Sequence, residues 1–255
     1  SEMCIRDRYT PDELLFFSFN KGLFIFHKQT GQIRPFVLID KEMNDQTCIN
    51  GFSVNIQRIT KNKILFSAQH IFIYDIVTRK FDIVATMGKE YERQSPLIIA
   101  TVGTKTYLSD LKNICEYDSS EGTFKTIYQG QHIINDASMD KDGVFWLAST
   151  EGLLRYDPRT GKSELIQTSL FQDVASVVAD NQYRIWIGTR RHLFVYSSHT
   201  HNFATLDEVD GVLPNEYIFH ATLLAKNGDV FVGGTTGMTV VNSCLLYTSD
   251  AADDP

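Results

Sequence analysis

Apolar residues recur at every second position on both sides of short turns, and this period predicts antiparallel hairpins. One example is the pair of segments Ile185–Ile187 and Leu193–Tyr196, which are separated by five residues. A helical solenoid would need apolar residues three or four positions apart, so this class of repeat protein is excluded. The pattern therefore indicates a chain built from β-hairpins.

The hairpins repeat with a period near forty residues. One residue of each hairpin serves as an anchor, and successive anchors lie 48, 43, 39, 40 and 45 positions apart. A further apolar residue stands ten positions before each anchor. A Gly, His or Asn stands four positions before it, and these types tolerate positive φ, so each is predicted to hold the left-handed position of a tight turn. The anchors are Phe26, Tyr74, Tyr117, Tyr156, Tyr196 and Val241; the residues ten positions earlier are Phe16, Ile64, Tyr107, Trp146, Trp186 and Phe231; the turn residues are Gly22, His70, Asn113, Gly152, His192 and Gly237.

Each hairpin is flanked by one earlier and one later strand, which gives four strands per repeat. Four-stranded units of this length are typical of β-propeller blades. We therefore predict an all-β fold, a β-propeller of four-stranded blades with about six blade units, cut from a seven-bladed ring. The first unit begins near Leu14 without a clear preceding strand, and the last stops near Asn242 without its outer strand.

Composition agrees with a β-rich globular protein. The 255 residues are 43% hydrophobic, 12% aromatic and 22% charged, and the formal net charge is −7. The acidic balance argues against a nucleic-acid partner. No run of eighteen apolar residues suggests a membrane span.

Both ends of the chain resemble translated adapter sequence from transposase-based sequencing libraries. Residues 1–8 read SEMCIRDR, and the segment that begins at Cys244 reads CLLYTSDAADD. We therefore expect residues 1–8 and 244–255 to be adapter-derived and non-native, and residues 9–243 to be a propeller fragment of a longer gene. The remaining cysteines, Cys48 and Cys115, are too few for a disulfide framework.

Ready-made catalytic motifs are absent from the sequence: there is no P-loop, no G-x-S-x-G and no H-E-x-x-H. His199 and His201 could bind a metal, but a solvated turn is the favoured interpretation. Asp140 begins a stretch similar to a calcium loop, yet the repeat explains it as a turn residue. Trp146 and Trp186 occupy identical repeat positions, so they are predicted to pack between blades instead of stacking on sugars. We expect no catalytic residue, no metal and no cofactor.

Candidate ligand-binding residues follow from blade topology. The loop that enters the innermost strand and the turn between the second and third strands lie at the same end of a blade, so polar residues of both should gather there. Tyr217 offers a ring for sugar stacking, with amide, carboxylate and guanidinium groups around it. The predicted site consists of Asn135, Asp136, Arg190, Arg191, Asn215, Glu216 and Tyr217, with Glu151 and Asp173 nearby; the opposite end, with His199 and His201, is predicted not to bind.

The repeat resembles that of two-component regulator propellers. Asp140–Asp157 reads DKDGVFWLASTEGLLRYD, and Ile185–Thr189 and Asn227–Met238 repeat its central part. The second and third units depart from it, because they lack the Gly-Thr pair and the closing Gly. Asp210–Tyr217 is similar to the segment that introduces the last blade of such sensors.

The resemblance implies the periplasmic sensor region of a Bacteroidetes-type hybrid two-component system histidine kinase, anchored in the inner membrane. Such a domain is not an enzyme; it senses a glycan-derived oligosaccharide and signals to a downstream kinase. The implied partners are an oligosaccharide or other small-molecule ligand, the neighbouring sensor and kinase modules, and a second copy if the protein forms a homodimer. Two alternatives stay open, a propeller enzyme of the lyase or lactonase type and a protein-binding scaffold.

Overall fold

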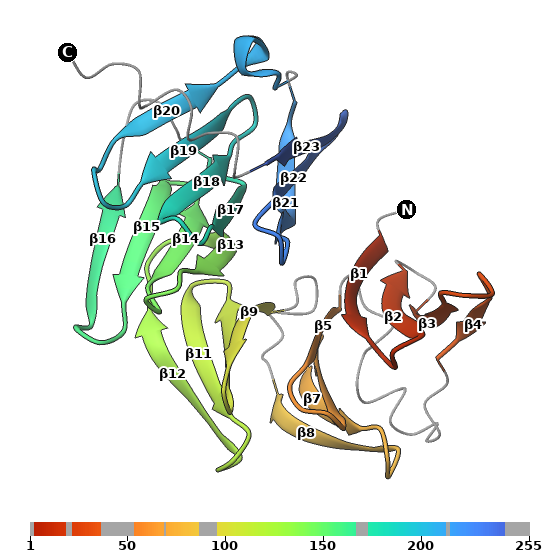
Figure 1. Cartoon of the computed structure of the whole chain (residues 1–255). Helices are drawn as coiled ribbons and strands as arrows, with labels where there is room; N and C mark the ends of the chain where they lie inside the picture. The colour runs from red at the N-terminus through yellow and green to blue at the C-terminus, as the bar shows by residue number, and fades with distance from the viewer. Residues whose placement is uncertain are drawn as a thin grey trace. The chain divides into compact units, whose positions relative to one another are not determined.

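The computed structural model describes residues 3–18, 22–36, 54–68, 70–86, 96–166, 173–212 and 215–242, and of residues 3–8 it describes the backbone alone. Residues 1–127 and 128–255 form two compact units, which are treated separately below. All regular structure in the described residues is β-strand apart from one short 3₁₀ helix, η2 (Glu208–Asp210), which confirms the predicted all-β propeller fold (Figure 1). No helix of the described residues is long and apolar enough to cross a bilayer.

The first unit holds three sheets, each an antiparallel meander of four strands in chain order. The strands of its first sheet are β1 (Met3–Arg8), β2 (Glu13–Ser18), β3 (Gly22–His27) and β4 (Ile33–Pro35); those of its second are β5 (Asn55–Arg58), β6 (Lys63–Ser67), β7 (His70–Asp75) and β8 (Lys80–Thr86); those of its third are β9 (Leu97–Val102), β10 (Lys105–Asp110), β11 (Asn113–Asp118) and β12 (Thr123–Gln129).

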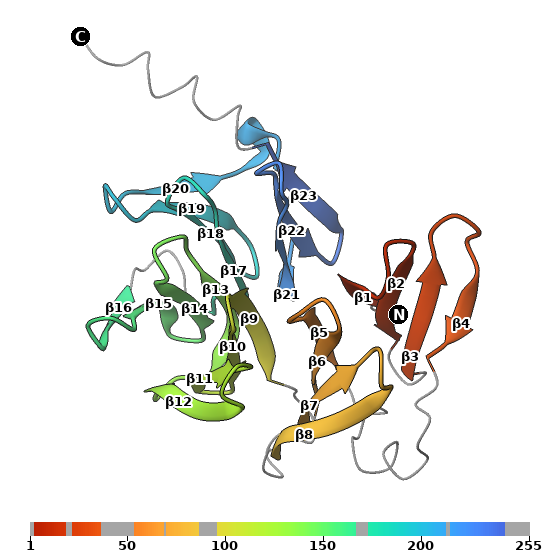
Figure 2. The ribbon, with the colours of Figure 1, turned by 60° about the horizontal axis from the view of Figure 1, so that its bottom comes forward.

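The second unit continues the pattern with sheets four to six, seen from a second direction in Figure 2. Sheet six has three strands among the described residues, and residues 243–255 lie outside them. The strands of sheet four are β13 (Ile134–Met139), β14 (Phe145–Ser149), β15 (Gly152–Asp157) and β16 (Lys162–Ile166); those of sheet five are β17 (Ser176–Ala179), β18 (Arg184–Gly188), β19 (Leu193–Ser197) and β20 (Phe203–Leu206); those of sheet six are β21 (Tyr217–Leu224), β22 (Val230–Gly234) and β23 (Gly237–Val241).

Strand β1 corrects the expectation that the first hairpin has no preceding strand. It pairs with β2 in antiparallel register, with Met3 opposite Ser18 and Arg8 opposite Leu14. These residues belong to the stretch predicted to be adapter-derived. Pairing at a sheet edge is made by backbone N–H and C=O groups, so it needs no apolar alternation in the added strand.

The cross-strand register shows which hairpin positions are equivalent. Tyr196 lies opposite Ile185, so Trp186 is the residue after the partner of the anchor. In sheets one and two the partners of the anchors are Leu14 and Ile64, and the equivalents of Trp186 are therefore Leu15 and Leu65. The predicted packing position, ten residues before the anchor, is therefore wrong by one residue in these two sheets. Counted from the anchor to its cross-strand partner, the first hairpin is one residue longer and the second one residue shorter than the hairpin of sheet five.

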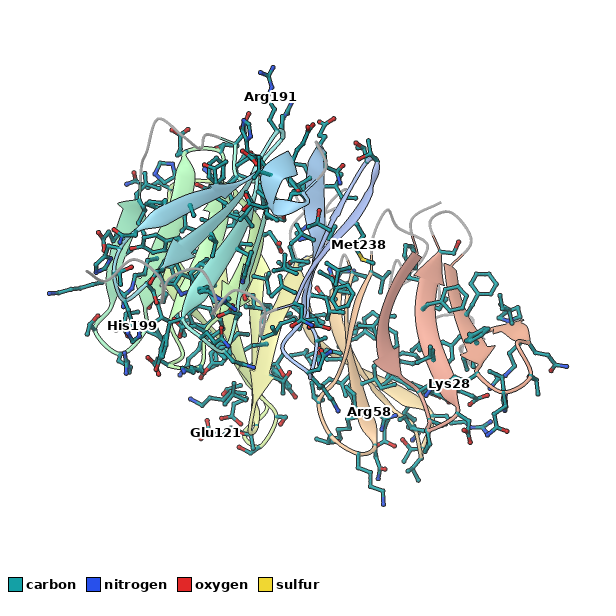
Figure 3. The ribbon with its side chains drawn as sticks, turned by 45° about the horizontal axis from the view of Figure 1, so that its top comes forward. Lys28, Arg58, Glu121, Arg191, His199 and Met238 are labelled. Atoms are coloured by element: carbon teal, nitrogen blue, oxygen red, sulfur yellow. The ribbon has the colours of Figure 1, made fainter. Side chains whose placement is uncertain are left out.

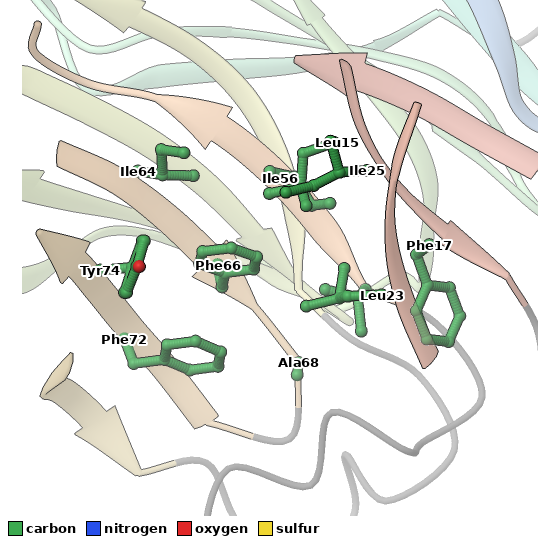
Figure 4. Close-up of a cluster of buried hydrophobic side chains, with 11 residues drawn as sticks. Leu15, Phe17, Leu23, Ile25, Ile56, Ile64, Phe66, Ala68, Phe72 and Tyr74 are labelled. Atoms are coloured by element: carbon green, nitrogen blue, oxygen red, sulfur yellow. The ribbon is translucent and has the colours of Figure 1, made fainter. Parts of the chain in front are cut away.

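The side chain at the position of Trp186 packs against the next sheet in four of the hairpins. Leu15 packs in one cluster with Phe66 of sheet two, as Figure 4 shows, and Leu65 packs in another with Leu108 of sheet three. Trp146 packs with residues of sheet five and Trp186 with residues of sheet six. Both tryptophans are almost fully buried, at 1% and 0% exposure, which confirms that they pack between blades.

A buried aspartate carboxylate accepts a hydrogen bond from the indole N–H of each tryptophan. Trp146 Nε1 donates to Asp140 Oδ2 at 2.9 Å, and Trp186 Nε1 donates to Asp180 Oδ2 at 3.0 Å. The other oxygen of Asp140 accepts from the backbone N–H groups of Asp142 and Val144 and so holds the preceding turn. One aspartate therefore fixes both the turn and the orientation of the packing side chain.

The predicted left-handed turn position is correct for three glycines and wrong for the other residues. Gly22, Gly152 and Gly237 have positive φ, whereas His70, Asn113 and His192 are not among the described residues that do. In two of those turns a side chain at the preceding strand end supports the backbone instead: Asp110 Oδ1 accepts from Asn113 N at 3.1 Å, and Thr189 Oγ1 accepts from His192 N at 3.1 Å. A capped turn closes without a residue in the left-handed region.

Sheet six exposes an apolar face on the side away from sheet five. Leu223, Phe231 and Val240 lie opposite one another across its three strands. Leu223 and Val240 are 59% and 51% exposed, and Met238 near the start of β23 is also exposed; Figure 3 shows its side chain projecting from the sheet. Phe231 is the equivalent of Trp186, so this face corresponds to the one that packs between sheets elsewhere.

Two valines of sheet six should respond oppositely to the same substitution. Val232→Thr places a hydroxyl in the cluster between sheets five and six, so it should lower the free energy of unfolding by about 1–3 kcal/mol. Val240→Thr on the exposed face should change it by less than about 0.5 kcal/mol and reduce aggregation. Both tryptophans lie in the second unit, so urea unfolding followed by their fluorescence measures the unit concerned. Equal losses for the two variants would show that the Val240 face is buried in solution.

Candidate functional site

The entering loops and the hairpin turns of the second unit meet at one end of its sheets, as the topology predicts. Asp173 N donates to Thr150 O at 3.1 Å, and Tyr217 N donates to Thr189 O at 3.2 Å. Each of these bonds joins the loop that enters one sheet to the hairpin turn of the sheet before it. Figure 3 places Arg191 at this end and His199 at the opposite end of the same unit.

Gly188 and Thr189 show why a Gly-Thr pair precedes this turn. A Cβ on Gly188 would lie 2.9 Å from the Cβ of Tyr217, so only glycine lets the loop before β21 approach so closely. Thr189 Oγ1 donates to His192 O at 3.1 Å and accepts from His192 N. The pair therefore holds the turn and presents Arg190 and Arg191 outward.

Asn135 and Asp136 bind neighbouring strands. Asn135 Nδ2 donates to Val174 O at 2.9 Å. Asp136 is 3% exposed, and its Oδ2 accepts from Val177 N of β17 at 3.0 Å and from Thr222 Oγ1 of β21 at 3.3 Å. These contacts tie the first strands of three consecutive sheets, and the ligand-binding role of both residues stays a prediction.

His220 completes the environment of Asp136 at the centre of the unit. Its Nδ1 lies 3.3 Å from Asp136 Oδ1, and its φ of 59° is unusual for a residue with a Cβ. It stands where the pairing of β21 with β22 shifts register. The sequence reasoning missed His220, because a bulge inside a strand breaks the alternation that would assign its direction.

Asn215 and Glu216 hold the loop before β21 against the last hairpin turn. Asn215 Oδ1 accepts from Thr236 N at 3.1 Å, and its Nδ2 donates to Gly237 O at 3.2 Å. The backbone oxygen of Glu216 accepts from Thr235 N, while its side chain is exposed. Both the oxygen and the nitrogen of the Asn215 side-chain amide are therefore hydrogen-bonded within the protein, whereas the Glu216 carboxylate faces solvent.

Arg190 and Arg191 differ in their surroundings although they are adjacent. Arg190 Nε lies 4.0 Å from Asp173 Oδ2, and both side chains are largely exposed. Arg191 instead lines a pocket of about 390 Å³, and its guanidinium has no ion-pair or hydrogen-bond partner among the described residues. Its guanidinium is free to bind an anionic group.

The pocket brings two predicted residues together with a segment that the sequence reasoning did not assign to the site. Arg191 and Tyr217 both line it, but Tyr217 is only 3% exposed and packs in the cluster between sheets five and six, so its ring is not open for stacking. The remaining lining residues are His192, Leu193, Leu206, Asp207, Glu208, Val209 and Val212.

Asp207 and Glu208, at the start of helix η2, form the acidic part of the pocket wall. Asp207 caps the helix by accepting from Val209 N at 2.8 Å, Asp210 bonds back to Asp207 N, and Gly211 ends the helix with φ of 81°. The sequence of Asp207–Gly211 has an acidic residue at each end of a four-residue stretch and then a glycine, which is a recognisable helix-capping pattern. This short helix could therefore have been predicted from the sequence. The carboxylate of Glu208 has no partner among the described residues.

The other residues considered for chemistry have protein partners. His201 Nδ1 lies 2.7 Å from Tyr196 Oη, and the ring of His199 lies 4.1 Å from that of Tyr183. The described residues hold no cluster of three metal-binding side chains. Burial raises the pKa of the Cys115 thiol to about 11, so at neutral pH it is protonated; Cys48 lies outside the described residues.

Comparison with known proteins gives structural neighbours only. No family model and no curated protein matches the chain. The extracellular domain of the Bacteroides thetaiotaomicron system BT4673 is similar with a TM-score of 0.68 at 18% identity, over 93% of this chain and 32% of that one. The extracellular domain of the hybrid two-component system BT3049 of that organism is similar with a TM-score of 0.66 at 14% identity, over 93% and 33%.

A streptogramin B lyase is similar with a TM-score of 0.65 at 13% identity, over 95% of this chain and 84% of that one. At these identities the likeness shows the propeller fold. The chain spans about one third of the length of the two bacterial extracellular domains.

Asp136 should contribute to stability far more than an exposed carboxylate at the same end. Asp136→Ala leaves the buried Val177 N–H and the Thr222 hydroxyl without this acceptor, which should lower the free energy of unfolding by about 2–4 kcal/mol. Glu151→Ala, on an exposed turn, should change it by less than about 0.5 kcal/mol. Denaturant titration monitored by tryptophan fluorescence checks this, and an unaltered midpoint for Asp136→Ala would contradict the structural tie.

Proposed function

We propose that this chain is the non-catalytic, ligand-sensing propeller of a hybrid two-component system histidine kinase, located in the periplasm. The ligand is a glycan-derived oligosaccharide, and the signal passes to a kinase in the same parent protein. The observation that carries the proposal is the pocket beside Arg191 on the loop end of the second unit. Support for the sensing role comes from three of the neighbours of like fold, which are extracellular domains of bacterial signalling systems.

The pocket is suited to convert binding into a change of packing. Its residues come from the β18–β19 turn, from the segment 206–212 and from Tyr217 at the start of β21. A ligand that touches all three therefore stabilises one arrangement of sheets five and six over others. Signalling needs only that this arrangement and its alternatives differ in affinity for the ligand.

A lyase-type enzyme is the second candidate. The streptogramin B lyase shares the fold over most of both chains, and Asp136 with His220 supplies an acid–base pair at 3.3 Å. An enzyme of this class would convert its ligand, whereas a sensor returns it unchanged. Incubation with the bound compound followed by mass spectrometry separates the two, because a new product that disappears in His220→Gln would establish catalysis.

A protein-binding scaffold has one observation in its favour, the exposed apolar face of sheet six. That face lies at the repeat position which packs onto the following sheet elsewhere in both units. Its apolar character is therefore explained by the blade repeat and does not require a foreign protein.

Arg191 should dominate ligand binding and Arg190 should not. Arg191→Ala should weaken oligosaccharide binding by about ten- to a hundredfold through loss of a charge-assisted hydrogen bond, with the melting temperature unchanged because the side chain is exposed. Arg190→Ala, which removes the adjacent charge outside the pocket, is the matched control.

A glycan array on the purified chain identifies the ligand, and calorimetry measures the affinities of the wild type and both variants. Equal affinities for all three proteins would exclude this pocket. Tyr217→Ala is unsuitable as a test, because Tyr217 belongs to the core and its loss should destabilise the unit.

A further inference from the structure

The pocket presents no exposed tyrosine, phenylalanine or tryptophan ring among its lining residues, although such a ring is the usual stacking surface of a sugar site. Aliphatic side chains contribute to its lining, and among them Leu206 is half-buried and Val209 is 95% exposed. The hydroxyl of its single tyrosine, Tyr217, faces Thr239 Oγ1 at 3.4 Å. An accessible aliphatic lining binds a small apolar group, such as the methyl of an acyl substituent, better than the face of a pyranose ring.

The walls carry opposite charges on different elements. Arg191, on the β18–β19 turn, has a guanidinium without a partner in the described part of the chain, and this planar group matches a carboxylate through two parallel hydrogen bonds. The corresponding turn of sheet four carries Thr150 and Glu151 instead. On the other wall, the carboxylate of Glu208 has no partner within the residues that the structure describes, and one oxygen of Asp207 accepts from Val209 N. Carboxylates accept hydrogen bonds from hydroxyl groups, which a sugar supplies in number.

We propose that the pocket binds one terminal sugar residue that carries both a carboxylate and an N-acyl group. Arg191 binds the carboxylate, the aliphatic side chains of Leu206 and Val209 contact the acyl methyl, and the acidic wall accepts hydrogen bonds from the hydroxyls. The cavity of about 390 Å³ lies near the lower end of the range for ligand pockets, which suits a single residue at the end of a chain. This proposal rests on the proposed function and specifies the ligand of the same site.

The test varies the ligand and the protein together. Calorimetry on the full chain compares N-acetylneuraminic acid, its methyl ester and the analogue with hydroxyl in place of the acetamido group. N-acetylmuramic acid is included because the same chemistry occurs in bacterial cell walls as well as in animal glycans. The proteins are the wild type, Arg191→Gln and the control Arg190→Gln.

We expect at least one of the two acids to bind, and the acid preferred identifies the source. In the wild type and in Arg190→Gln, esterification of N-acetylneuraminic acid or removal of its acetamido group should each weaken binding at least tenfold if that acid is preferred; matched derivatives serve for N-acetylmuramic acid. In Arg191→Gln the difference between acid and ester should disappear, while the effect of the acetamido group should remain.

Neutral oligosaccharides that bind more tightly than either acid, and that still lose affinity in Arg191→Gln, would overturn the inference and leave the proposed sensor in place. Failure of every saccharide, acidic or neutral, to bind would overturn both. Binding of the acids with no difference between Arg191→Gln and Arg190→Gln would show that the carboxylate is bound elsewhere, and would also overturn the inference.

Discussion

Apolar side chains packed between neighbouring sheets hold each unit together. An isolated four-stranded meander has two faces and can bury neither alone, so the sheets are stable only as neighbours. The residues Leu15, Leu65, Trp146 and Trp186 make this contact in turn. Where the residue is tryptophan, burial of the indole requires a partner for its N–H, and the aspartate of the preceding turn provides it. A short segment such as Asp140–Trp146 therefore determines the turn, the start of the following strand and the packing of that strand against the next sheet.

Because this packing recurs from repeat to repeat, the fold could be predicted from the sequence. The alternation within hairpins and the forty-residue period both follow from the packing contact, and both are visible without any coordinates. Details that depend on the length of a single turn could not be predicted: a constant spacing misplaced Leu15 and Leu65 by one residue. Strand β1 was missed for another reason, since edge pairing is a property of the backbone and leaves no pattern in the side chains.

The candidate site was predictable in part. Topology brought Arg191 and Tyr217 to one end of one unit, and both line its pocket. The exposure of Tyr217 could not be predicted, because it depends on the close approach that Gly188 permits, a contact between residues 29 positions apart. Asp136 and Asn215 show the general difficulty. A polar residue near a loop can bind a ligand or another strand equally well on chemical grounds, and only the positions of its neighbours decide.

Sheet six has a particular place in the energetics of its unit. It packs on sheet five by one face and exposes the other, so less free energy opposes its detachment than opposes that of sheet five, which is packed on both faces. Its amide protons should therefore exchange with solvent before those of β18. The pocket takes part of its wall from the first residue of this sheet, and it exists only while the sheet is docked. Any compound held there adds its binding free energy to that docking, so occupancy and local order become a single equilibrium.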